Sequence, residues 1–569
     1  MTGSATAGLQ QNNYGNQFAG FNLNNNNGKV SSSLTLNYSK RNSYEKIVTD
    51  RNFAPDSILS QNAFTKYPAD VYFINYSIAF PLAKKWELDF STSTNLNDFR
   101  NETENVSTIS KISTKQILTQ NLNRVINDGS ALNFRSGFSA KLVLDSVGSE
   151  LINDIFYNYS RNQTNQNFST AFSIPQQFEL VGDGAGTNNR NHFNVQSDLK
   201  LKLKQKITVE TGVKASFLKF DNETNYFEGK GINREKNIAR TNTFKYSENI
   251  NSAYVQGSKT FGENFVLKAG TRLENTNMEG RQIIPDDTSF TIHRTDLFPY
   301  IYLSKSLMKI AGFNLRAYLI YRRTINRPVY EQLNPFPRYI DQYLSEVGNP
   351  SLRPQFTKNY EANISIDEMP IFALGVNDTR DIFTNVIYQA DSSQQQAFRT
   401  YDNLGKNKEW YLRGLGAIPP GKRYFFVIGA QYNHNFYEGI YEKKPLAFKK
   451  GTWTFFTYQT FKIDKLSVIT LHGFMRLKGQ QQFYELTTFG SLNSSVNRKF
   501  LKEKLIVTLS INDIFATNKN NFILSQRSVR ASGFRLSDTR RVGLSFRYNF
   551  GLKKRDEQQG AFPVEAPIN

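Results

Sequence analysis

Apolar and polar residues alternate with a period of two along much of this chain. In residues 541–550 every second residue is apolar, and the residues between are polar or glycine. The apolar positions are Val542, Leu544, Phe546, Tyr548 and Phe550. This period predicts a β-strand with one apolar face. Because Arg541 and Arg547 lie on the opposite face, we expect that face to contact water.

Short polar turns join many of these alternating segments in pairs. The clearest lie at residues 24–28, 81–85, 127–129, 204–206 and 262–264. The Asp128-Gly129 pair is a strong hairpin signal. The hairpins are separated by longer polar stretches, at residues 41–68, 145–190, 221–243, 276–292, 324–357, 437–450 and 516–539. Short turns at one end and long loops at the other are typical of outer-membrane barrels.

The short connections also give the number of strands. We place ten of them, near residues 26, 83, 128, 205, 263, 309, 373, 418, 464 and 501. The resulting hairpins, with residues 3–9 before them and 541–550 after them, make about 22 strands, and a barrel of that width needs a plug. We therefore predict an all-β fold, a transmembrane antiparallel β-barrel over residues 1–550 with short periplasmic turns and long extracellular loops. Residues 551–569 are predicted to be a disordered periplasmic tail.

Composition agrees with a barrel. The chain has 569 residues, of which 39% are hydrophobic and 14% aromatic, with 46 Phe and 29 Tyr. No stretch approaches the ~18 apolar residues of a membrane-spanning helix, whereas barrels use aromatic residues as girdles at both interfaces. The net charge of +21 is spread along the chain. This spread favours a basic lumen and basic loops over a nucleic-acid site, and leaves attraction to anionic lipid or an anionic ligand open.

The sequence offers no catalytic constellation, so we predict that the protein is not an enzyme and uses no metal or cofactor. There is no cysteine, and the four histidines are far apart, at His192, His293, His434 and His472. The glycine-rich residues 182–186 lack the Gly-Lys-Ser/Thr ending of a phosphate loop and are interpreted as a loop tip. Asp286-Asp287 is interpreted as a solvated turn rather than a calcium site.

Seven residues are candidates for contact with a ligand. Arg316, Tyr318 and Arg322 share a strand face opposite Leu315 and Leu319, so we expect them to point into the lumen. The other four lie in the long loop at residues 324–357, and they are Tyr330, Arg338, Tyr339 and Asp341. Aromatic and arginine groups suit a sugar, a peptide or an anionic chelate. Loop packing and lumen solvation are the alternative role for each.

Several segments carry a family resemblance. The most specific are Arg327–Phe336 (RPVYEQLNPF), Gly348–Gln355 (GNPSLRPQ) and Asn359–Glu361 (NYE), preceded by Asn249–Tyr254 and Ala269–Thr276. In this order they resemble TonB-dependent outer-membrane receptors and transporters, in the branch known as the outer-membrane β-barrel family. Structural roles, such as stiff loops and turns, are expected for the motif residues Arg327, Pro328, Tyr330, Asn334, Pro335, Gly348, Asn349, Pro350, Pro354 and Glu361.

The resemblance implies a transporter in the cell outer membrane of a Gram-negative bacterium. Such a protein imports a siderophore, cobalamin, oligosaccharide or peptide. Its expected partners are outer-membrane lipid and lipopolysaccharide, a plug domain and through it TonB, and a surface lipoprotein. The family places a plug before the barrel, whereas here the first predicted strand begins at Gly3. A plug-less passive channel, a barrel serving another outer-membrane complex and a surface adhesin therefore stay open as alternatives.

Overall fold

The computed structural model describes residues 1–551 except 54–55, 232, 263, 311, 342, 368, 392–393, 419–422, 482 and 526–528. Side chains are also outside the description at residues 339–341, 390–391, 394–396 and 418. Apart from Gly551, the predicted tail lies beyond the described residues. None of the described helices is long and apolar enough to cross a membrane.

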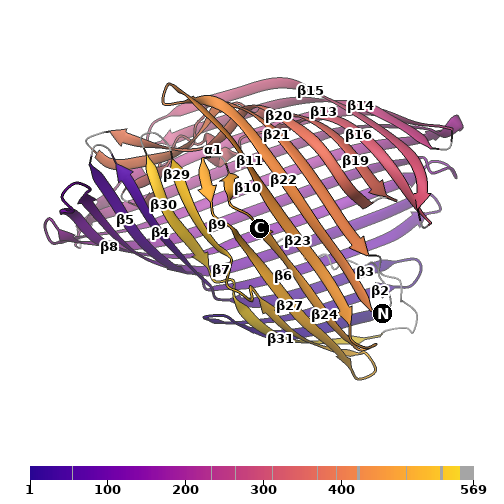
Figure 1. Cartoon of the computed structure of the whole chain (residues 1–569), viewed down its shortest axis with the longest axis horizontal. Helices are drawn as coiled ribbons and strands as arrows, with labels where there is room; N and C mark the ends of the chain where they lie inside the picture. The colour runs from indigo at the N-terminus through magenta and orange to yellow at the C-terminus, as the bar shows by residue number, and fades with distance from the viewer. Residues whose placement is uncertain are drawn as a thin grey trace.

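The chain forms a closed antiparallel barrel of 22 strands (Figure 1). Hydrogen bonds between the first and last strands complete the ring, with Gly3 opposite Phe550 and Gln11 opposite Val542. The strands, in order around the ring, are β1 (Thr2–Gln11), β2 (Gly15–Asn26), β3 (Ser31–Arg41), β6 (Ala69–Ala83), β7 (Trp86–Lys111), β8 (Ile117–Val143), β9 (Glu150–Ile174), β10 (Phe178–Leu203), β11 (Ile207–Lys230), β13 (Asn242–Phe261), β14 (Phe265–Ile284), β15 (Thr288–Ile310), β16 (Phe313–Asn326), β19 (Gln355–Ile366), β20 (Met369–Asp391), β21 (Gln394–Ile418), β22 (Tyr424–Tyr441), β23 (Lys444–Lys462), β24 (Ser467–Arg476), β27 (Phe489–Phe500), β28 (Leu505–Asn512) and β31 (Arg541–Phe550).

The remaining elements belong to the connections between these strands. They are β4 (Tyr44–Phe53), β5 (Ser57–Lys66), η1 (Lys204–Lys206), β12 (Asn233–Lys236), η2 (Ile238–Arg240), α1 (Tyr330–Leu333), β17 (Arg338–Asp341), β18 (Leu344–Glu346), β25 (Gly479–Gln481), β26 (Tyr484–Leu486), β29 (Lys519–Ser525) and β30 (Arg530–Ser537). The hairpins β4–β5, β25–β26 and β29–β30 pair with one another and with β7. They extend the wall at the end of the barrel opposite the N-terminus (Figure 1).

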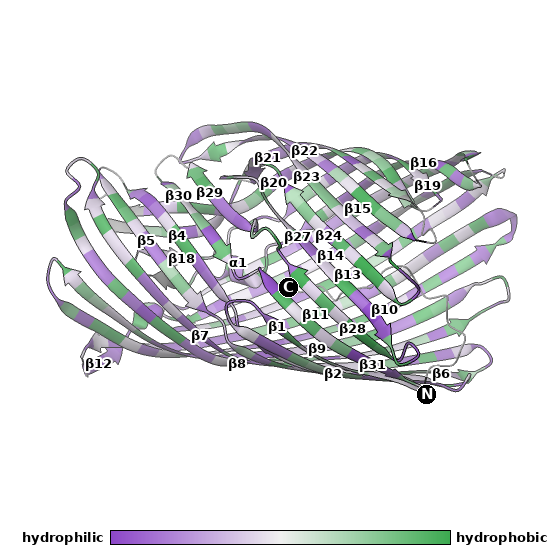
Figure 2. Ribbon diagram, turned by 60° about the horizontal axis from the view of Figure 1, so that its bottom comes forward, coloured by the Kyte–Doolittle hydropathy of each residue, from purple (hydrophilic) through white to green (hydrophobic). Residues whose placement is uncertain are grey.

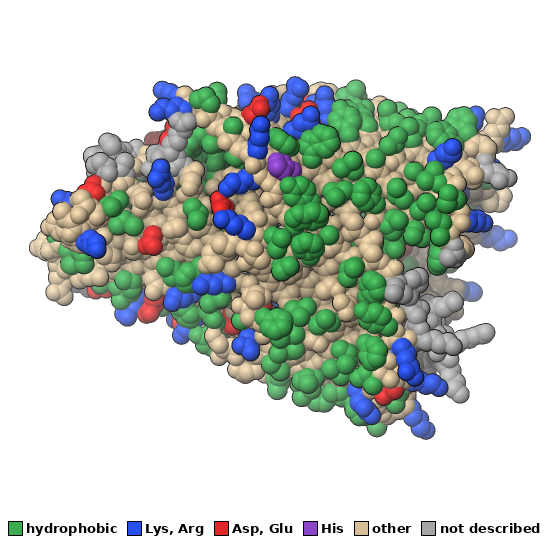
Figure 3. Space-filling view, viewed as in Figure 1, with side chains coloured by type: hydrophobic (Ala, Val, Ile, Leu, Met, Phe, Trp, Pro, Cys, Tyr) green, Lys and Arg blue, Asp and Glu red, His purple; other side chains and the backbone are tan. Residues whose placement is uncertain are grey.

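Apolar side chains cover the outside of the barrel, as the alternation predicts. On β31 the exposed apolar residues are Val542, Leu544, Phe546 and Tyr548, and the register places Leu505 and Leu509 of β28 on the same face. Apolar and polar positions alternate along the strands (Figure 2). On the face seen in Figure 3 the apolar side chains gather toward the end that holds the N-terminus. Lipid thus faces this band, and the lumen receives the polar alternate residues.

The predicted number of strands is confirmed, and Thr2 and Phe550 both lie at the short-turn end. Several local predictions are wrong, and two of them affect how the strands are counted. Residues 127–129 are not a turn, because they lie inside the continuous strand β8. Residues 145–190 are not an outer loop either. They contain a short turn, all of β9 and the first half of β10. The predicted turn divides β8 into two strands, and the predicted loop omits β9, so the total number of strands does not change.

Gly129 explains the first error. A Cβ at this position would collide with the carbonyl oxygen of Gln163 and the ring of Phe99. The glycine therefore permits close packing inside a sheet, which sequence alone cannot distinguish from a turn.

Strand extension beyond the membrane explains the second error. β8 has 27 residues, whereas about 9–11 residues are enough to cross the bilayer. Beyond the bilayer, hydrogen bonding continues but neither face contacts lipid, so the period-two pattern is lost. For the same reason, the predicted loops 276–292 and 437–450 are mostly strand, and residues 182–186 lie in β10. At the short-turn end, the turn predicted near 373 lies between Ile366 and Met369.

Gly129→Ala tests this explanation. We expect it to lower the stability of the barrel by ~1–3 kcal/mol, because a methyl group has no room beside the backbone of β9. The measurement is the temperature at which the barrel loses its compact migration on gels in detergent. Gly257→Ala is the matched control, since a Cβ there has no neighbour within 4 Å, and an equal loss in both variants would contradict the explanation.

Candidate ligand site in the barrel lumen

A long connection between β16 and β19 folds into the barrel instead of standing above it. We name residues 327–354 the crossing loop. It begins with Arg327, whose guanidinium binds the carboxylate of Glu274 and donates to the hydroxyl of Thr276 at 3.1 Å. Both partners are buried on the lumen face of β14, since Leu273, which precedes Glu274 and lies on the opposite face of the strand, is exposed to lipid. The ion pair therefore draws the loop inward at its first residue.

The first helical turn of the crossing loop packs on the inner wall. The ring of Tyr330 lies 3.6 Å from that of Phe220 on β11, measured between centroids. Leu333 is fully buried in the same apolar cluster, together with Phe244 and Met278. This contact holds α1 against β11, β13 and β14.

The middle of the crossing loop reaches the opposite wall. The amide of Asn121 on β8 donates to the hydroxyl of Tyr343 at 2.8 Å, and both residues are buried. Next to it, β18 pairs in parallel with β21, and Leu344 lies opposite Ala397. Strands β8 and β21 lie on nearly opposite sides of the ring, so the loop spans the lumen.

The family motif residues hold the crossing loop in shape. Gly348 donates its backbone N–H to the carbonyl of Asn334 at 2.8 Å, and a Cβ at this glycine would collide with that same backbone. The amide of Asn349 donates to the carbonyl of Tyr401 on β21. On β19, Glu361 accepts a 2.5 Å hydrogen bond from Tyr411. These contacts all lie within the chain.

A buried apolar cluster lies at the outer mouth and includes Tyr343 and Leu344 of the crossing loop. We name it the mouth cluster. Its members come from both sides of the ring and from three outer hairpins, and they are Phe53, Leu59, Ile109, Tyr343, Leu344, Val386, Ile387, Ala397, Leu404, Tyr437, Tyr441, Phe483, Leu524, Val529 and Ala531. Burial of so many apolar groups stabilises the closed arrangement by the hydrophobic effect.

Beneath the mouth cluster, the inner wall of β19 to β24 contains a cavity of about 460 Å³, which we name the lumen pocket. Its volume falls in the ordinary range of small-molecule sites, roughly 300–1,000 Å³. Its outer side is aromatic and its inner side is polar. The lining residues are Gln355, Thr379, Ile382, Phe383, Thr384, Asn407, Glu409, Asn433, Asn435, Tyr437, Phe448, Thr452, Thr454, Arg476, Gln480, Gln481 and Phe483.

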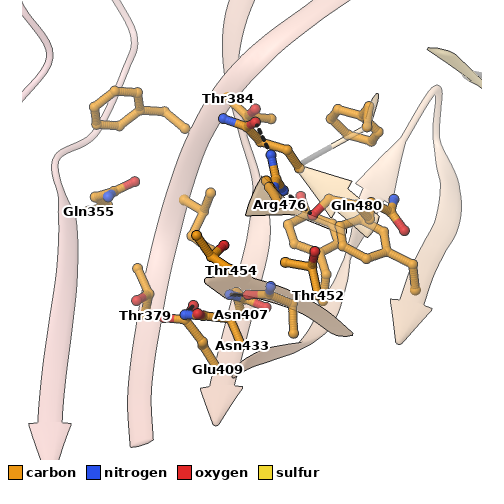
Figure 4. Close-up of a pocket in the computed structure, with 17 residues that line it drawn as sticks. Gln355, Thr379, Thr384, Asn407, Glu409, Asn433, Thr452, Thr454, Arg476 and Gln480 are labelled. Atoms are coloured by element: carbon orange, nitrogen blue, oxygen red, sulfur yellow. Dashed lines mark hydrogen bonds between the residues drawn. The ribbon is translucent and has the colours of Figure 1, made fainter. Parts of the chain in front are cut away.

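Hydrogen bonds between neighbouring strands orient the polar groups of the lumen pocket (Figure 4). Glu409 accepts from the amides of Asn377, at 2.8 Å, and Asn433, at 2.5 Å. The amide of Asn407 donates to Asn435 at 2.7 Å. At the opposite end of the pocket in Figure 4, Arg476 donates to the side chain of Gln481 at 3.0 Å.

Three polar atoms of the pocket have no hydrogen-bond partner within the described part of the chain. They are the hydroxyls of Thr384 and Tyr437 and the amide oxygen of Asn407. The side chains of Thr384 and Tyr437 are 2% and 5% exposed. Buried polar groups are normally hydrogen-bonded, and each one left unpaired costs about 1–3 kcal/mol. The lumen pocket therefore contains three polar groups whose hydrogen-bonding capacity the described residues do not use.

The residues predicted from the sequence are separated in the structure. Arg316, Tyr318 and Arg322 lie on the lumen side of β16, but Tyr318 bonds to Ser365 near the periplasmic end and Arg322 bonds to Asn359. Tyr330 is engaged in the wall contact, and Arg338 forms an exposed ion pair with Glu346 at 2.5 Å. The side chains of Tyr339 and Asp341 lie outside the description. None of the described members of this set lines the lumen pocket.

Sequence reasoning missed the lumen pocket because its residues come from six strands and a loop hairpin. Each of its amides resembles an ordinary polar residue on the wet face of a strand. A local signal does exist in the alternation of Asn407 with Glu409 and of Asn433 with Asn435. It places amide and carboxylate groups side by side on adjacent strands, but only the register of the sheet shows that they meet.

The comparisons with known proteins identify the family. The model of the Outer membrane protein beta-barrel family matches residues 142–548. The chain belongs to this family, which places it in the outer membrane of a Gram-negative bacterium. No curated protein sequence matches the chain closely enough to be reported as a relative.

Solved structures with a similar fold include siderophore receptors. FpvA of P. aeruginosa, in a structure with bound heterologous pyoverdines, is 11% identical with a TM-score of 0.60, covering 96% of this chain and 71% of that chain. The ferric enterobactin receptor PfeA of Pseudomonas aeruginosa is 13% identical with a TM-score of 0.56, covering 96% and 81%. The siderophore receptor PiuA of Acinetobacter baumannii is 10% identical with a TM-score of 0.58, covering 96% and 82%. Identities this low establish a common fold.

Arg327→Ala should release the first anchor of the crossing loop. Loss of charge-assisted hydrogen bonds costs about 1.5–3 kcal/mol, so we expect the loop to leave the lumen more often and the conductance of the barrel in planar bilayers to rise. The control is Arg353→Ala, because Arg353 is exposed and its partner Asp381 is partly exposed. Equal conductance in Arg327→Ala and the wild type would show that the loop does not obstruct the lumen.

The hairpin β25–β26 supplies Gln480, Gln481 and Phe483 to the lumen pocket. Glu485 of this hairpin lies 2.7 Å from the ammonium groups of both Lys450 and Lys478. Their hydrogen bonds lower the pKa of the Glu485 carboxyl to about 2. A lowered folded-state pKa means that the stabilisation is complete above the ordinary carboxyl pKa, near 4.5, and disappears as the pH falls through about 2.

We therefore expect Glu485→Gln to speed amide hydrogen exchange in β25 and β26 at pH 7. Added salt should reduce the difference between variant and wild type, because it screens exposed ion pairs. Glu438→Gln is the control, since Glu438 forms an exposed pair with Lys406 away from this hairpin. Unchanged exchange in Glu485→Gln would mean that other contacts hold the hairpin.

Proposed function

We propose that this chain is the barrel of a TonB-dependent outer-membrane transporter that imports a small ligand into the periplasm. The observation that carries the proposal is a polar pocket inside the lumen, enclosed by the mouth cluster above it and flanked by the crossing loop. A ligand in such a site must be released inward by a change of structure. An energy-coupled partner is the expected source of that change.

The neighbours of known structure support the class of function. Three of them are receptors for ferric enterobactin, pyoverdine or another siderophore, and they share this barrel over nearly the whole chain. By analogy, a plug domain and TonB are the proposed partners for opening the lumen. A surface lipoprotein covering the outer mouth is a further proposed partner.

A passive channel is the second candidate. The lumen of a barrel this wide favours it, because porins of fewer strands already conduct. The crossing loop weighs against it, since the loop spans the lumen from β14 to β8. A surface adhesin finds less support, because an adhesin has no need of a polar pocket enclosed within the wall.

Energy coupling is tested by uptake in whole cells that produce the protein. The probes are radiolabelled ferric siderophores, cobalamin and neutral oligosaccharides, each supplied separately. We expect accumulation of one class to fall to background when a protonophore collapses the proton gradient, and equally in a strain without TonB.

The control for this assay is a strain that lacks the protein. Uptake that requires the protein but continues without TonB and without a proton gradient would replace the transporter proposal with the passive channel.

A further inference from the structure

We propose that the lumen pocket binds a neutral, hydroxyl-rich ligand, a short carbohydrate, rather than an anionic metal chelate. This inference rests on the proposed function, since it names the class of ligand for the same lumen. It follows from three properties of the pocket, namely its charge, its hydrogen-bonding groups and its aromatic side.

The charge of the pocket is balanced, unlike that of the chain. The whole chain carries a net charge of +21, yet the ionised groups that line the pocket are one acid, Glu409, and one base, Arg476. Both are engaged with neighbouring amides, Glu409 with Asn377 and Asn433, and Arg476 with Gln481. An anionic chelate held in a cavity requires an excess of cationic groups to offset its desolvation. The pocket has no such excess.

The hydrogen-bonding groups of the pocket suit hydroxyls. Six amide side chains line it, and each can both donate and accept, as a sugar hydroxyl can. They are Gln355, Asn407, Asn433, Asn435, Gln480 and Gln481. Four threonines and Tyr437 add hydroxyl groups. A ligand whose surface consists of hydroxyls at short intervals can match such a lining without a fixed charge.

Three polar atoms among the lining residues have unused hydrogen-bonding capacity. Tyr437 and Thr384 are almost fully buried, and their hydroxyls have no partner in the described part of the chain. The amide oxygen of Asn407 is also unpaired and needs a donor. Hydroxyl groups of a carbohydrate supply both donors and acceptors to these three positions, so binding would remove an existing energetic cost.

The outer side of the pocket is aromatic. It contains Phe383, Tyr437, Phe448 and Phe483, with the rings of Tyr437 and Phe448 stacked 4.6 Å apart. Aromatic side chains present large apolar surfaces with defined geometry. They can cover the C–H groups of a sugar ring while the amides on the inner side bind its hydroxyls. The pocket thus has one side for each kind of carbohydrate surface.

A peptide fits the pocket less well. A short peptide is a zwitterion with two charged ends, whereas both charged groups of the pocket are already bonded to side chains of the protein. Its extended backbone would also favour an open groove or a sheet edge. We therefore treat peptide binding as an outcome that would contradict the proposal.

The test measures binding to the purified full chain in detergent by isothermal titration calorimetry. The probes are cellobiose, maltotriose and N,N′-diacetylchitobiose, compared with ferric catecholate and hydroxamate chelates and with dipeptides and tripeptides. We expect saturable binding to at least one carbohydrate, and an affinity that changes little with ionic strength because the ligand has no charge.

Two conservative variants locate the site. Tyr437→Phe and Thr384→Val each remove an unpaired hydroxyl without changing the shape of the side chain much. We expect each to weaken carbohydrate binding about three- to tenfold. Their thermal stability should be equal to that of the wild type or higher, because a buried unpaired hydroxyl has been removed. A purely structural role would instead lower stability.

The matched controls lie on the lumen face of β23, outside the pocket. Tyr458→Phe and Thr460→Val make the same chemical changes there and should leave binding unchanged. Selective binding of chelates or peptides, absence of carbohydrate binding, or equal losses in the controls would each overturn the proposal. Because the assay requires no energy source, these results are independent of whether transport depends on TonB.

Discussion

Hydrogen bonding between the first and last strands is the constraint on which the whole structure depends. In a bilayer no water is present to satisfy backbone N–H and C=O groups, so a sheet can span it only when both of its edges are paired. Here β1 and β31 pair from Gly3 to Gln11. This closure leaves no edge strand unpaired, and it brings both ends of the described chain to one side of the membrane.

The wide lumen creates a second problem, which the crossing loop addresses. A ring of 22 strands encloses more space than its own inward side chains fill. The crossing loop fills part of this space by connecting Arg327, at the wall of β14, with Tyr343, at the wall of β8. At the outer end, the mouth cluster joins three neighbouring hairpins to the strands β20, β21 and β22 across the ring. Polarity therefore changes along the barrel axis, from an apolar outer mouth to a polar interior.

The lumen pocket lies at this change of polarity. Its aromatic side is shared with the mouth cluster through Tyr437 and Phe483, and its polar side is formed by alternate residues of the strands below. The same architecture therefore provides closure toward the outside and hydrogen-bonding groups toward the interior. The hairpin β25–β26 supplies Gln480, Gln481 and Phe483 to this site, and its Glu485 forms ion pairs with Lys450 and Lys478.

The family resemblance and the observed contacts place the crossing loop differently. The motif around Arg327 and Gly348 led us to expect a stiff outer loop. In the structure, hydrogen bonds connect the loop to its own backbone and to β21. Its position inside the lumen was not predicted. Inward folding depends on Glu274 and Phe220, which are remote in sequence from the loop. Glu274 lies in the family segment Ala269–Thr276, but the segment does not show that its partner is Arg327.

The sequence by itself determined the all-β fold, the number of strands and the side of the membrane on which the first strand begins and the last strand ends. These properties follow from the period-two alternation, because lipid accepts apolar side chains only and every membrane-spanning strand must repeat the pattern. Tertiary structure alone decided where the strands end, what Gly129 does and which polar residues form the pocket. Outside the bilayer the pattern is lost, and residues such as Asn407, Asn433 and Arg476 become neighbours only through the register of hydrogen bonds between strands.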